Sequence, residues 1–267
     1  MKKFINDIKK FWNYSSYNVK AELKSEVAGS FLSWLWWILD PLLYMLVYAF
    51  VASVIFSSGG TPAFLAFVFI GLNCWQFFNR VVRNSVKLVS NKKSIVTKVY
   101  IPKYMFIFEK IGTNGFKMIV SFIITAMFMV YYYFQGEIVL NFHMLWLLPL
   151  LAMLAIVAFA FSVIVMHFGV FVEDLLNIVT VGLQLVFYLS GIFYDITRNL
   201  KNHPTIQNLL YYGNPVALII TNIRNTLLYG MAPDFAALGI WLAVCLVISI
   251  IGVKIIYKYE NSYVKII

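Results

Sequence analysis

Hydrophobic residues along the chain are gathered into six long stretches, which polar and charged segments separate. A helix needs roughly 20 predominantly apolar residues to cross a lipid bilayer, and most of these stretches approach that length. The pattern therefore predicts an all-α, polytopic integral membrane protein whose six transmembrane helices lie within residues 31–267. The expected spans are residues 31–56, 63–82, 104–134, 144–170, 178–193 and 236–256.

The amino-acid composition supports this class of protein. Hydrophobic residues make up 62% of the 267 residues, and charged residues make up only 12%. A soluble domain contains about 45–50% apolar and about 25% charged residues. A soluble globular protein is therefore excluded.

Residues 1–30 differ from the spans, because lysines alternate there with apolar residues at helical spacing. Phe4, Ile8 and Phe11 recur three or four residues apart, which predicts an amphipathic helix. Such a helix lies in the membrane interface with its basic side chains toward anionic headgroups. We therefore expect an N-terminal cytoplasmic interface helix that binds membrane lipids.

Positive charge is unevenly divided between the two sides that six spans would define. One side holds residues 1–30, the connections after the second and fourth spans, and the C-terminal tail, and together these carry most of the lysines and arginines. The other side carries only Arg198, Lys201 and Arg224. Since positively charged loops stay in the cytoplasm, we expect both termini there and an even number of spans. The same placement argues against nucleic acid as a partner, although the net charge is +10.

Within residues 203–235, the stretch of residues 212–230 is apolar but does not fit a full span. Asn214-Pro215 interrupts it, Gly230 supplies a flexible end, and Arg224 places a charge in its middle. A full crossing would also put the basic tail outside the cell. We therefore expect a re-entrant helical hairpin on the outer side, between the fifth and sixth spans, that borders a pathway. The alternative is an interfacial loop whose Arg224 side chain reaches up to the headgroups.

Asp40 and Pro41 interrupt the first span. Asp is a good N-cap and Pro fits the first turn of a helix, so the pair predicts a break and a new helix beginning there. Asp40 is then either a helix cap near the headgroups or a functional charge inside the membrane. The sequence leaves both interpretations open.

Motifs that would indicate an enzyme are absent from the sequence. There is no G-x-x-x-x-G-K-[ST] loop for a nucleotide, no H-E-x-x-H or G-x-S-x-G motif, and no Cys/His cluster. The adjacent acids Glu173 and Asp174 give only weak support for a metal site that transfers phosphate. We therefore expect no catalytic residues, no metal and no cofactor on this chain, which favours a conduit or scaffold.

Four segments carry a resemblance to a known family. They are "GSFLSWLWWILDPLLYMLVYAFV", "FIGLNCWQFFNRVVRNSVKLVSNKKSIVTKVYIPKYMFI", "GVFVEDLLNIV", and "LSGIFYDITRN" followed by "YYGNPVALIITNIRNTLLYG". Across nearly the whole chain, the sequence resembles the membrane (permease) subunits of ABC-type polysaccharide exporters, the O-antigen and teichoic-acid exporter permeases. Two positions depart from the family pattern, since Gly191 stands where Pro is frequent and Glu173 stands where Arg is usual.

The resemblance implies a homodimer in the cytoplasmic membrane of a bacterium, with two copies of a separate ABC ATPase that binds ATP and Mg. The chain would be the transmembrane subunit that moves a lipid-linked polysaccharide, such as O-antigen or teichoic acid, across that membrane. Two cytoplasmic loops would contact the ATPase, and the outer hairpin would guard the exit. The coupling residues would be Lys92, Lys93, Ile95, Val96, Lys98, Val99, Pro102, Glu173 and Asp174, and the outer gate residues would be Asn214, Pro215, Arg224 and Gly230.

The residues themselves support the first of these contacts, a coupling helix over residues 91–102. Pro102 provides a stiff junction with the third span. Ile95, Val96 and Val99 offer an apolar face for docking, and the neighbouring lysines offer a polar one. The alternative is an ordinary positively charged cytoplasmic loop.

Candidates for substrate contact follow from the chemistry of a glycan, because sugar rings stack on aromatic rings and tyrosine hydroxyls form hydrogen bonds. Tyr44 and Tyr48 share a helix face, and Tyr188 is expected near the outer side. Lys110 and Lys117 lie on one face of the third span, where they could meet phosphate. A lipid-facing aromatic belt is the alternative for the tyrosines, and snorkelling to the headgroups is the alternative for Lys110.

Two other functions remain open at this stage. One is a permease of the same architecture that exports drugs or small lipids. The other is an integral membrane enzyme that modifies glycans, which would be active without any ATPase.

Overall fold

The computed structural model describes residues 2–29, 31–55 and 63–266 of the chain. All regular elements in these ranges are helices, which confirms the predicted all-α class. In chain order they are α1 (Lys2–Val27), η1 (Ser33–Leu35), α2 (Trp36–Ile55), α3 (Phe64–Val86), α4 (Leu88–Asn91), α5 (Lys93–Val96), α6 (Met105–Phe134), η2 (Phe142–Trp146), α7 (Leu147–Phe171), α8 (Leu175–Leu189), α9 (Ile196–Asn199), α10 (Pro204–Gly213), α11 (Pro215–Leu227) and α12 (Phe235–Ile266).

Several of these helices are suited to a bilayer. Within the described residues, four segments are long and apolar enough to cross a membrane by length and composition, namely α3, α6, η2 with α7, and α12. α8 is also apolar but has only 15 residues. The chain is therefore a polytopic membrane protein, as the sequence predicts.

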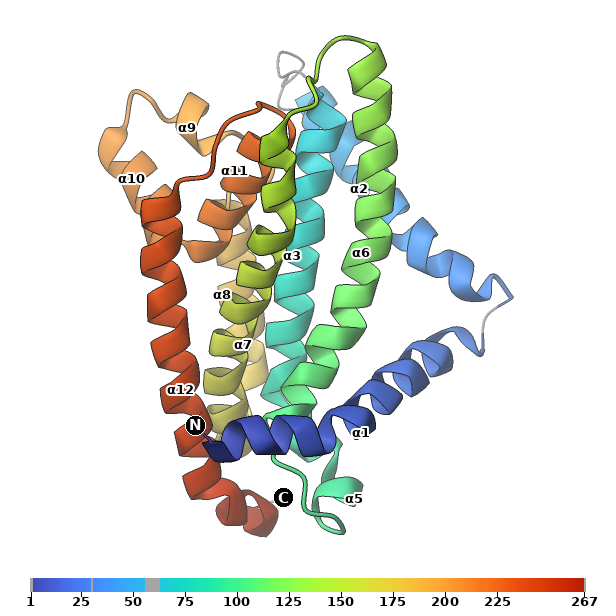
Figure 1. Ribbon diagram of the computed structural model, residues 1–267, viewed down its shortest axis with the longest axis vertical. Coiled ribbons are helices and arrows are strands. Elements are labelled where there is room, and N and C mark those ends of the chain that lie inside the picture. Colours follow the sequence, from blue (N-terminus) through green and yellow to red (C-terminus); the bar gives the residue numbers. More distant parts are fainter. Residues whose placement is uncertain (1, 30, 56–62, 267) are drawn as a thin grey trace.

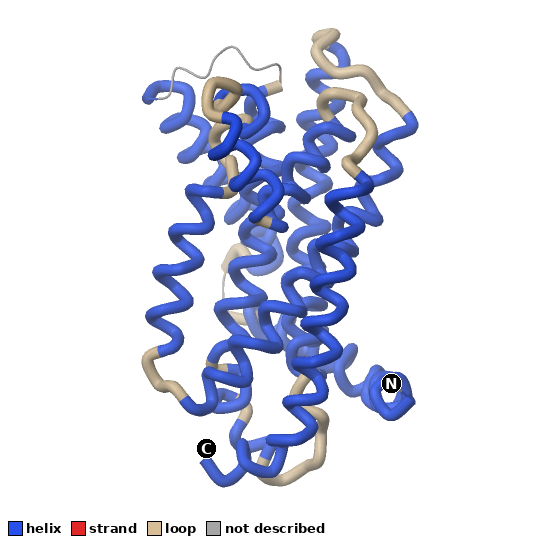
Figure 2. Tube along the Cα trace, turned by 90° about the vertical axis from the view of Figure 1, so that its left-hand side faces the viewer, coloured by secondary structure: helices blue, strands red, loops and turns tan. Residues whose placement is uncertain are grey.

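The long helices lie side by side and define two ends of a bundle (Figure 1). Both chain termini, α1 and α5 lie at one end, which we call the terminal end. α9, α10 and α11 lie at the opposite end, which we call the far end. The view turned by 90° shows most loops gathered at these two ends (Figure 2). The loop between α7 and α8 belongs to the terminal end, because His167 of α7 shares a hydrogen bond with Tyr263 of α12.

α3 forms the centre of the bundle. Of its 23 residues, 16 are buried, and it packs against α2, α6, α7, α8 and α11. Small residues permit close helix contact around it. A side-chain carbon on Gly169 of α7 would overlap the Val86 carbonyl group, and one on Gly252 of α12 would overlap Val163 of α7.

α1 is held against the terminal end by its apolar side. Phe4, Ile8 and Phe11 pack on a buried cluster that includes Tyr104 and Tyr263. The Phe4 and Tyr104 rings are 5.1 Å apart at their centroids. The expected amphipathic helix is therefore present as a helix, and its position in a membrane interface stays a prediction.

Two local expectations were wrong. Asp40 and Pro41 do not begin a new helix, because α2 begins at Trp36 and continues through Pro41. The short helix η1 leads directly into α2, so the helix is already established before the proline removes one hydrogen-bond donor. The segment of residues 91–102 is not one continuous helix either, because its regular structure ends with α5 at Val96.

Candidate functional site

The start of α11 is tied to the end of α8 by Asn214. Its side-chain oxygen accepts hydrogen bonds from the backbone N–H groups of Val216 at 3.0 Å and Ala217 at 3.3 Å, and Pro215 occupies the first turn. This is the N-cap arrangement that the Asn-Pro pair favours. The amide nitrogen of Asn214 donates to the Ser190 hydroxyl at 2.9 Å. One side chain therefore caps α11 and fixes it to the residue that follows α8.

Arg224 lies on the same helix and is only 2% exposed. Its guanidinium donates to three backbone carbonyls, those of Phe67 at 3.1 Å, Gly191 at 2.7 Å and Ile192 at 2.8 Å. It also lies over the Phe67 ring, 3.5 Å from the centroid. The side chain is thus buried inside protein, so the alternative in which Arg224 reaches up to the headgroups was wrong.

One glycine makes room for this guanidinium, and a second glycine supplies one of its carbonyl acceptors. A side-chain carbon on Gly71 of α3 would overlap it. Gly191 lies two residues after α8 and has φ +64°, the left-handed conformation that commonly ends a helix. Proline, which is frequent here in the resembling family, could not adopt that φ. The chain therefore ends α8 with a glycine.

Asn222 completes this arrangement, although the sequence analysis did not predict it as a site residue. Its side chain accepts a hydrogen bond from the Asp234 N–H at 2.7 Å and donates to the Tyr211 hydroxyl at 3.3 Å. Because Asp234 precedes α12 and Tyr211 belongs to α10, Asn222 joins both neighbours of α11. The available signal was an Asn within the otherwise mostly apolar stretch of residues 215–223. We call Asn214, Asn222 and Arg224 the α11 anchor.

Gly230, the fourth predicted gate residue, lies apart from the other three. It follows α11 with φ +65°, and a side-chain carbon there would come within 3.0 Å of Asn141. The structure therefore brings Asn214, Pro215 and Arg224 together around the end of α8, and leaves Gly230 at the other end of α11.

The predicted coupling loop at the terminal end presents only part of its predicted apolar face. Val96 is buried, Ile95 is half-buried, and Pro102 is buried at the junction with α6. Val99 is 55% exposed. Among the lysines, Lys93 and Lys98 are exposed, whereas Lys92 turns inward to an ion pair with Glu109.

Tyr100 and the second predicted coupling loop lie at the same end. The Tyr100 hydroxyl donates to the Glu260 carboxylate at 3.1 Å. Partial burial of this hydroxyl, and next the charge of Glu260, raise the pKa of Tyr100 to about 12. Glu173 and Asp174 are exposed in the loop between α7 and α8.

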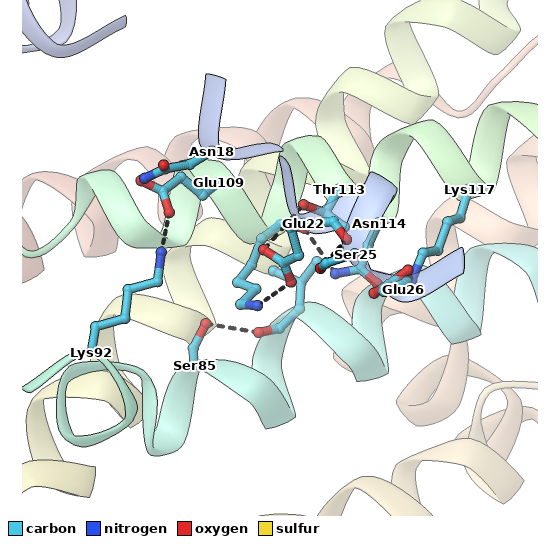
Figure 3. A network of polar contacts seen from close by, with 12 residues as sticks. Asn18, Glu22, Ser25, Glu26, Ser85, Lys92, Glu109, Thr113, Asn114 and Lys117 are labelled. Carbon is cyan, nitrogen blue, oxygen red and sulfur yellow. Dashed lines mark hydrogen bonds and ion pairs between the residues drawn. The ribbon is translucent and has the colours of Figure 1, made fainter. Parts of the chain in front are cut away.

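A row of polar contacts joins α1 to α6 (Figure 3). Glu109 is fully buried, accepts a hydrogen bond from Asn18 at 3.1 Å, and forms the ion pair with Lys92. Lys110 pairs with Glu22, and Lys117 pairs with Glu26 at 2.6 Å. We call these contacts the α1–α6 ladder. They place both predicted phosphate-binding lysines against carboxylates of α1.

The sequence analysis missed the α1 partners of this ladder. The available signal was spacing, since Asn18, Glu22 and Glu26 recur every four residues on one face of α1. Nothing in the sequence says that this face meets α6.

Tyr44 borders a polar cavity of about 350 Å³ between α2, α3 and α8, which we call the α2–α8 cavity. Its lining also includes Trp75, Arg80, Thr180 and Gln184. Tyr188 is 58% exposed on α8, outside this lining. The side chain of Tyr48 lies outside the described part of the structure. The predicted substrate contacts therefore fall into two groups, the tyrosines on α2 and α8 and the lysines of the ladder.

These features define a multi-pass helical membrane protein in which one short helix, α11, is buried at the far end of the bundle. The ABC-2 type transporter family matches residues 16–228, which is more than half of the chain. The chain belongs to this family, whose members are membrane subunits of transporters.

Three curated relatives are similar to this chain over most of their length. The O-antigen export system permease protein RfbA of Myxococcus xanthus is 27% identical over 231 residues, which cover 86% of each chain. Two proteins of the same name from Klebsiella pneumoniae are 24% and 23% identical over 247 residues, which cover 92% of each chain.

Proposed function

We propose that this chain is the transmembrane subunit of an ATP-driven exporter that moves a lipid-linked cell-envelope polysaccharide across the cytoplasmic membrane of a bacterium. The observation that carries the proposal is the similarity, over 86% to 92% of the chain, to three relatives named as O-antigen export permeases. The helical membrane architecture agrees with it. ATP and Mg would bind to a partner ABC ATPase, of which two copies would serve a homodimer.

The proposed topology has six spans formed by α2, α3, α6, α7, α8 and α12, with both termini in the cytoplasm. The distribution of lysines supports this orientation. α10 and α11 would form the re-entrant hairpin on the outer side. The position of α9 to α11 at the far end, opposite the termini, supports this assignment (Figure 1).

The outer gate would be the α11 anchor together with the end of α8. Non-helical backbone is tolerated at membrane depth only where it is buried in protein or lines a wet cavity. The segment after α8 meets that condition, because the buried Arg224 satisfies its Gly191 and Ile192 carbonyls. Motion of α8 would therefore be transmitted to α11, which suits a gate at the exit. Gly230 would act as the hinge after α11.

Coupling to the ATPase would use the exposed parts of the two terminal-end loops. Among the predicted contacts, the exposed residues are Lys93, Lys98 and Val99 of the first loop and Glu173 and Asp174 of the second. Lys92, Val96 and Pro102 would not contact the ATPase themselves. They would hold the loop in place against α6. The exposure of opposite charges in the two loops supports a polar contact surface.

The translocation path would run between two copies of the chain, beside α2 and α8. Arg80, Thr180 and Gln184 in the α2–α8 cavity are polar side chains that are costly to expose to lipid. A second copy that covers this side would remove that cost, and Tyr44, Tyr48 and Tyr188 would then contact the glycan. Lys110 and Lys117 stay predicted phosphate contacts, although a phosphate would have to displace Glu22 or Glu26.

The proposal can be tested by purifying the chain with the ABC ATPase that a neighbouring gene encodes, and by reconstituting the complex in vesicles. We expect lipid-linked glycan from the same cells to stimulate ATP hydrolysis by the complex. We also expect glycan transfer across the vesicle membrane to stop when the Walker lysine of the ATPase is replaced. Transfer that continues with the inactive ATPase would contradict the proposal and favour a membrane enzyme. Stimulation by amphiphilic drugs alone would favour a drug exporter.

A further inference from the structure

A second polar cavity, of about 420 Å³, lies between α1, α2, α3 and α6. We call it the α1–α2 cavity. Its lining includes Trp36 and Trp37 at the start of α2, Asp40 one turn later, and Gln76, Arg80 and Asn84 along α3. Its volume falls within the roughly 300–1,000 Å³ of typical small-molecule sites. Gln76 and Arg80 also line the α2–α8 cavity, so the two cavities share one wall.

The lining offers donors and acceptors without partners. The indole N–H of Trp37 is buried, and the structure records no hydrogen bond for it within the described ranges. The Asp40 carboxylate forms no hydrogen bond or ion pair with any described residue, and among these residues Arg80 bonds only to Gln76, at 3.4 Å. A buried polar group without a partner is costly, so the Trp37 indole favours a hydrogen-bonding ligand or water. The exposed Asp40 and the half-buried Arg80 add an acceptor and a donor to the same cavity.

The charges around the cavity indicate a neutral ligand. Glu22 and Glu26 border it, but Lys110 and Lys117 neutralise them in the α1–α6 ladder. Of the charged lining residues, Asp40 and Arg80 remain, and their charges cancel. A phosphate group would find no net positive field here, whereas a neutral polyol would find both an acceptor and a donor.

The combination of flat aromatic and planar polar side chains narrows the ligand class further. Tryptophan rings stack on the C–H faces of sugars, and carboxylate, amide and guanidinium groups bond pairs of neighbouring hydroxyls. Trp37 is held edge-on against Phe116, with ring centroids 5.2 Å apart, so its ring is positioned before any ligand binds. The cavity therefore has the aromatic wall and the polar groups of a saccharide site.

We propose that the α1–α2 cavity binds neutral sugar units, as a second saccharide site behind the path that Tyr44 borders. This inference rests on the proposed function and deepens it, because it assigns a place where a glycan is held next to the interface helix. Gln76 and Arg80 are the residues through which the two cavities would exchange a sugar unit. One wall belongs to α1, so occupancy would depend on the α1–α6 ladder.

The test uses the complete permease–ATPase complex in nanodiscs. The permease carries Asn84→Cys, and the rate of maleimide labelling is measured without a ligand and with maltose, lactose, N,N′-diacetylchitobiose or inorganic pyrophosphate. The native cysteines, Cys74 and Cys245, are buried and give little background. Asn84 is exposed in the lining, and Asn208→Cys on α10 is the matched control outside the cavity.

We expect at least one disaccharide to slow the labelling of Asn84→Cys and not that of Asn208→Cys. Adding Asp40→Ala should raise the disaccharide concentration needed for half-protection about tenfold, because one hydrogen-bonding group is lost. Asp40 is exposed and unpaired among the described residues, so folding should be unaffected.

Three results would overturn the inference: no protection by any of the disaccharides, protection by inorganic pyrophosphate only, or the same protection after Asp40→Ala. Measuring glycan transfer by the wild-type complex distinguishes a failure of the second-site inference from a failure of the proposed exporter function. A complex that transfers glycan but shows no protection refutes the second site alone. A complex that transfers no glycan refutes the exporter.

Discussion

Arg224 of α11 donates a hydrogen bond to the carbonyl oxygen of Gly191, the second residue after the end of α8, across 2.7 Å. The charge is thus held by carbonyl dipoles, with further bonds to Phe67 and Ile192. A planar guanidinium with several fixed donors can satisfy this set, and a lysine ammonium cannot reproduce it. The pair therefore explains why an arginine is buried in this segment.

Replacing this arginine should destabilise the protein strongly. For Arg224→Lys we expect a loss of about 3 kcal/mol or more, because at least two hydrogen bonds to a charged group disappear in a buried place. Thermal unfolding in detergent micelles measures the change. Arg198→Lys is the control, since Arg198 is exposed, pairs with Asp195 at 3.4 Å and should cost less than about 1 kcal/mol. Equal losses in the two variants would contradict the buried clamp.

Gly71 provides the space for the same guanidinium. Ala normally stabilises a helix by about 1 kcal/mol relative to Gly. Gly71→Ala should nevertheless destabilise the protein, because the added methyl group overlaps the Arg224 side chain. Gly115→Ala on α6 is the matched control, since the nearest neighbour of its methyl group would be a Phe77 atom at 3.9 Å, and it should be neutral or stabilising. If Gly71→Ala stabilises as much as the control, Arg224 has room elsewhere and the clamp is not fixed.

The left-handed backbone of Gly191 gives a third test at the same place. Gly191→Ala should destabilise by more than the about 1–2 kcal/mol of a left-handed alanine, because the new methyl would also lie 2.6 Å from Ile196. Gly182→Ala on α8 has no neighbour within 4 Å and should not destabilise. The melting temperatures of the two variants, measured under the same conditions, show whether only Gly191→Ala lowers the stability. A harmless Gly191→Ala would mean that the end of α8 can adopt another turn.

Much of this architecture could be predicted from the sequence, because it depends on local patterns. Apolar stretch length predicted the all-α membrane class, and the Asn214-Pro215 pair predicted the break before α11. The acceptors of Arg224 could not be predicted, since backbone carbonyls carry no sequence signature. The predicted helix break at Asp40-Pro41 was wrong, because the residues before the pair had already begun α2.

Lys110 and Lys117 illustrate the same limit for the candidate site. Their spacing correctly indicated one helix face, but the sequence does not state what packs on it. The carboxylates of α1 lie about 90 positions earlier in the chain, and only tertiary packing brings them together. Ion pairing across such a distance is set by the docking of α1 through its aromatic side, which no local pattern encodes.

Glu109 should connect the predicted coupling loop to α1, because one buried carboxylate contacts both Lys92 and Asn18. Glu109→Ala leaves Lys92 without its partner, and we expect faster amide hydrogen exchange in both α1 and α5. Hydrogen exchange with mass spectrometry compares the two segments in one experiment. Glu173→Ala removes an exposed acid and should leave both segments unchanged. Faster exchange in only one segment would show that the two are not joined through Glu109.

Val99 should be the apolar residue of the first coupling loop that reaches the ATPase, because it is 55% exposed whereas Val96 is 6% exposed. In a permease with Val99→Cys, a bifunctional thiol reagent should crosslink the chain to a cysteine on the ATPase surface, and ATP should change the yield. Val96→Cys is the matched control and should crosslink poorly, since the Val96 side chain is buried in the hydrophobic cluster that includes Tyr104. Equal yields at the two positions would mean that the loop refolds on binding. A yield of zero along the whole loop would remove residues 91–102 from the coupling surface and leave Glu173 and Asp174 as the predicted contact.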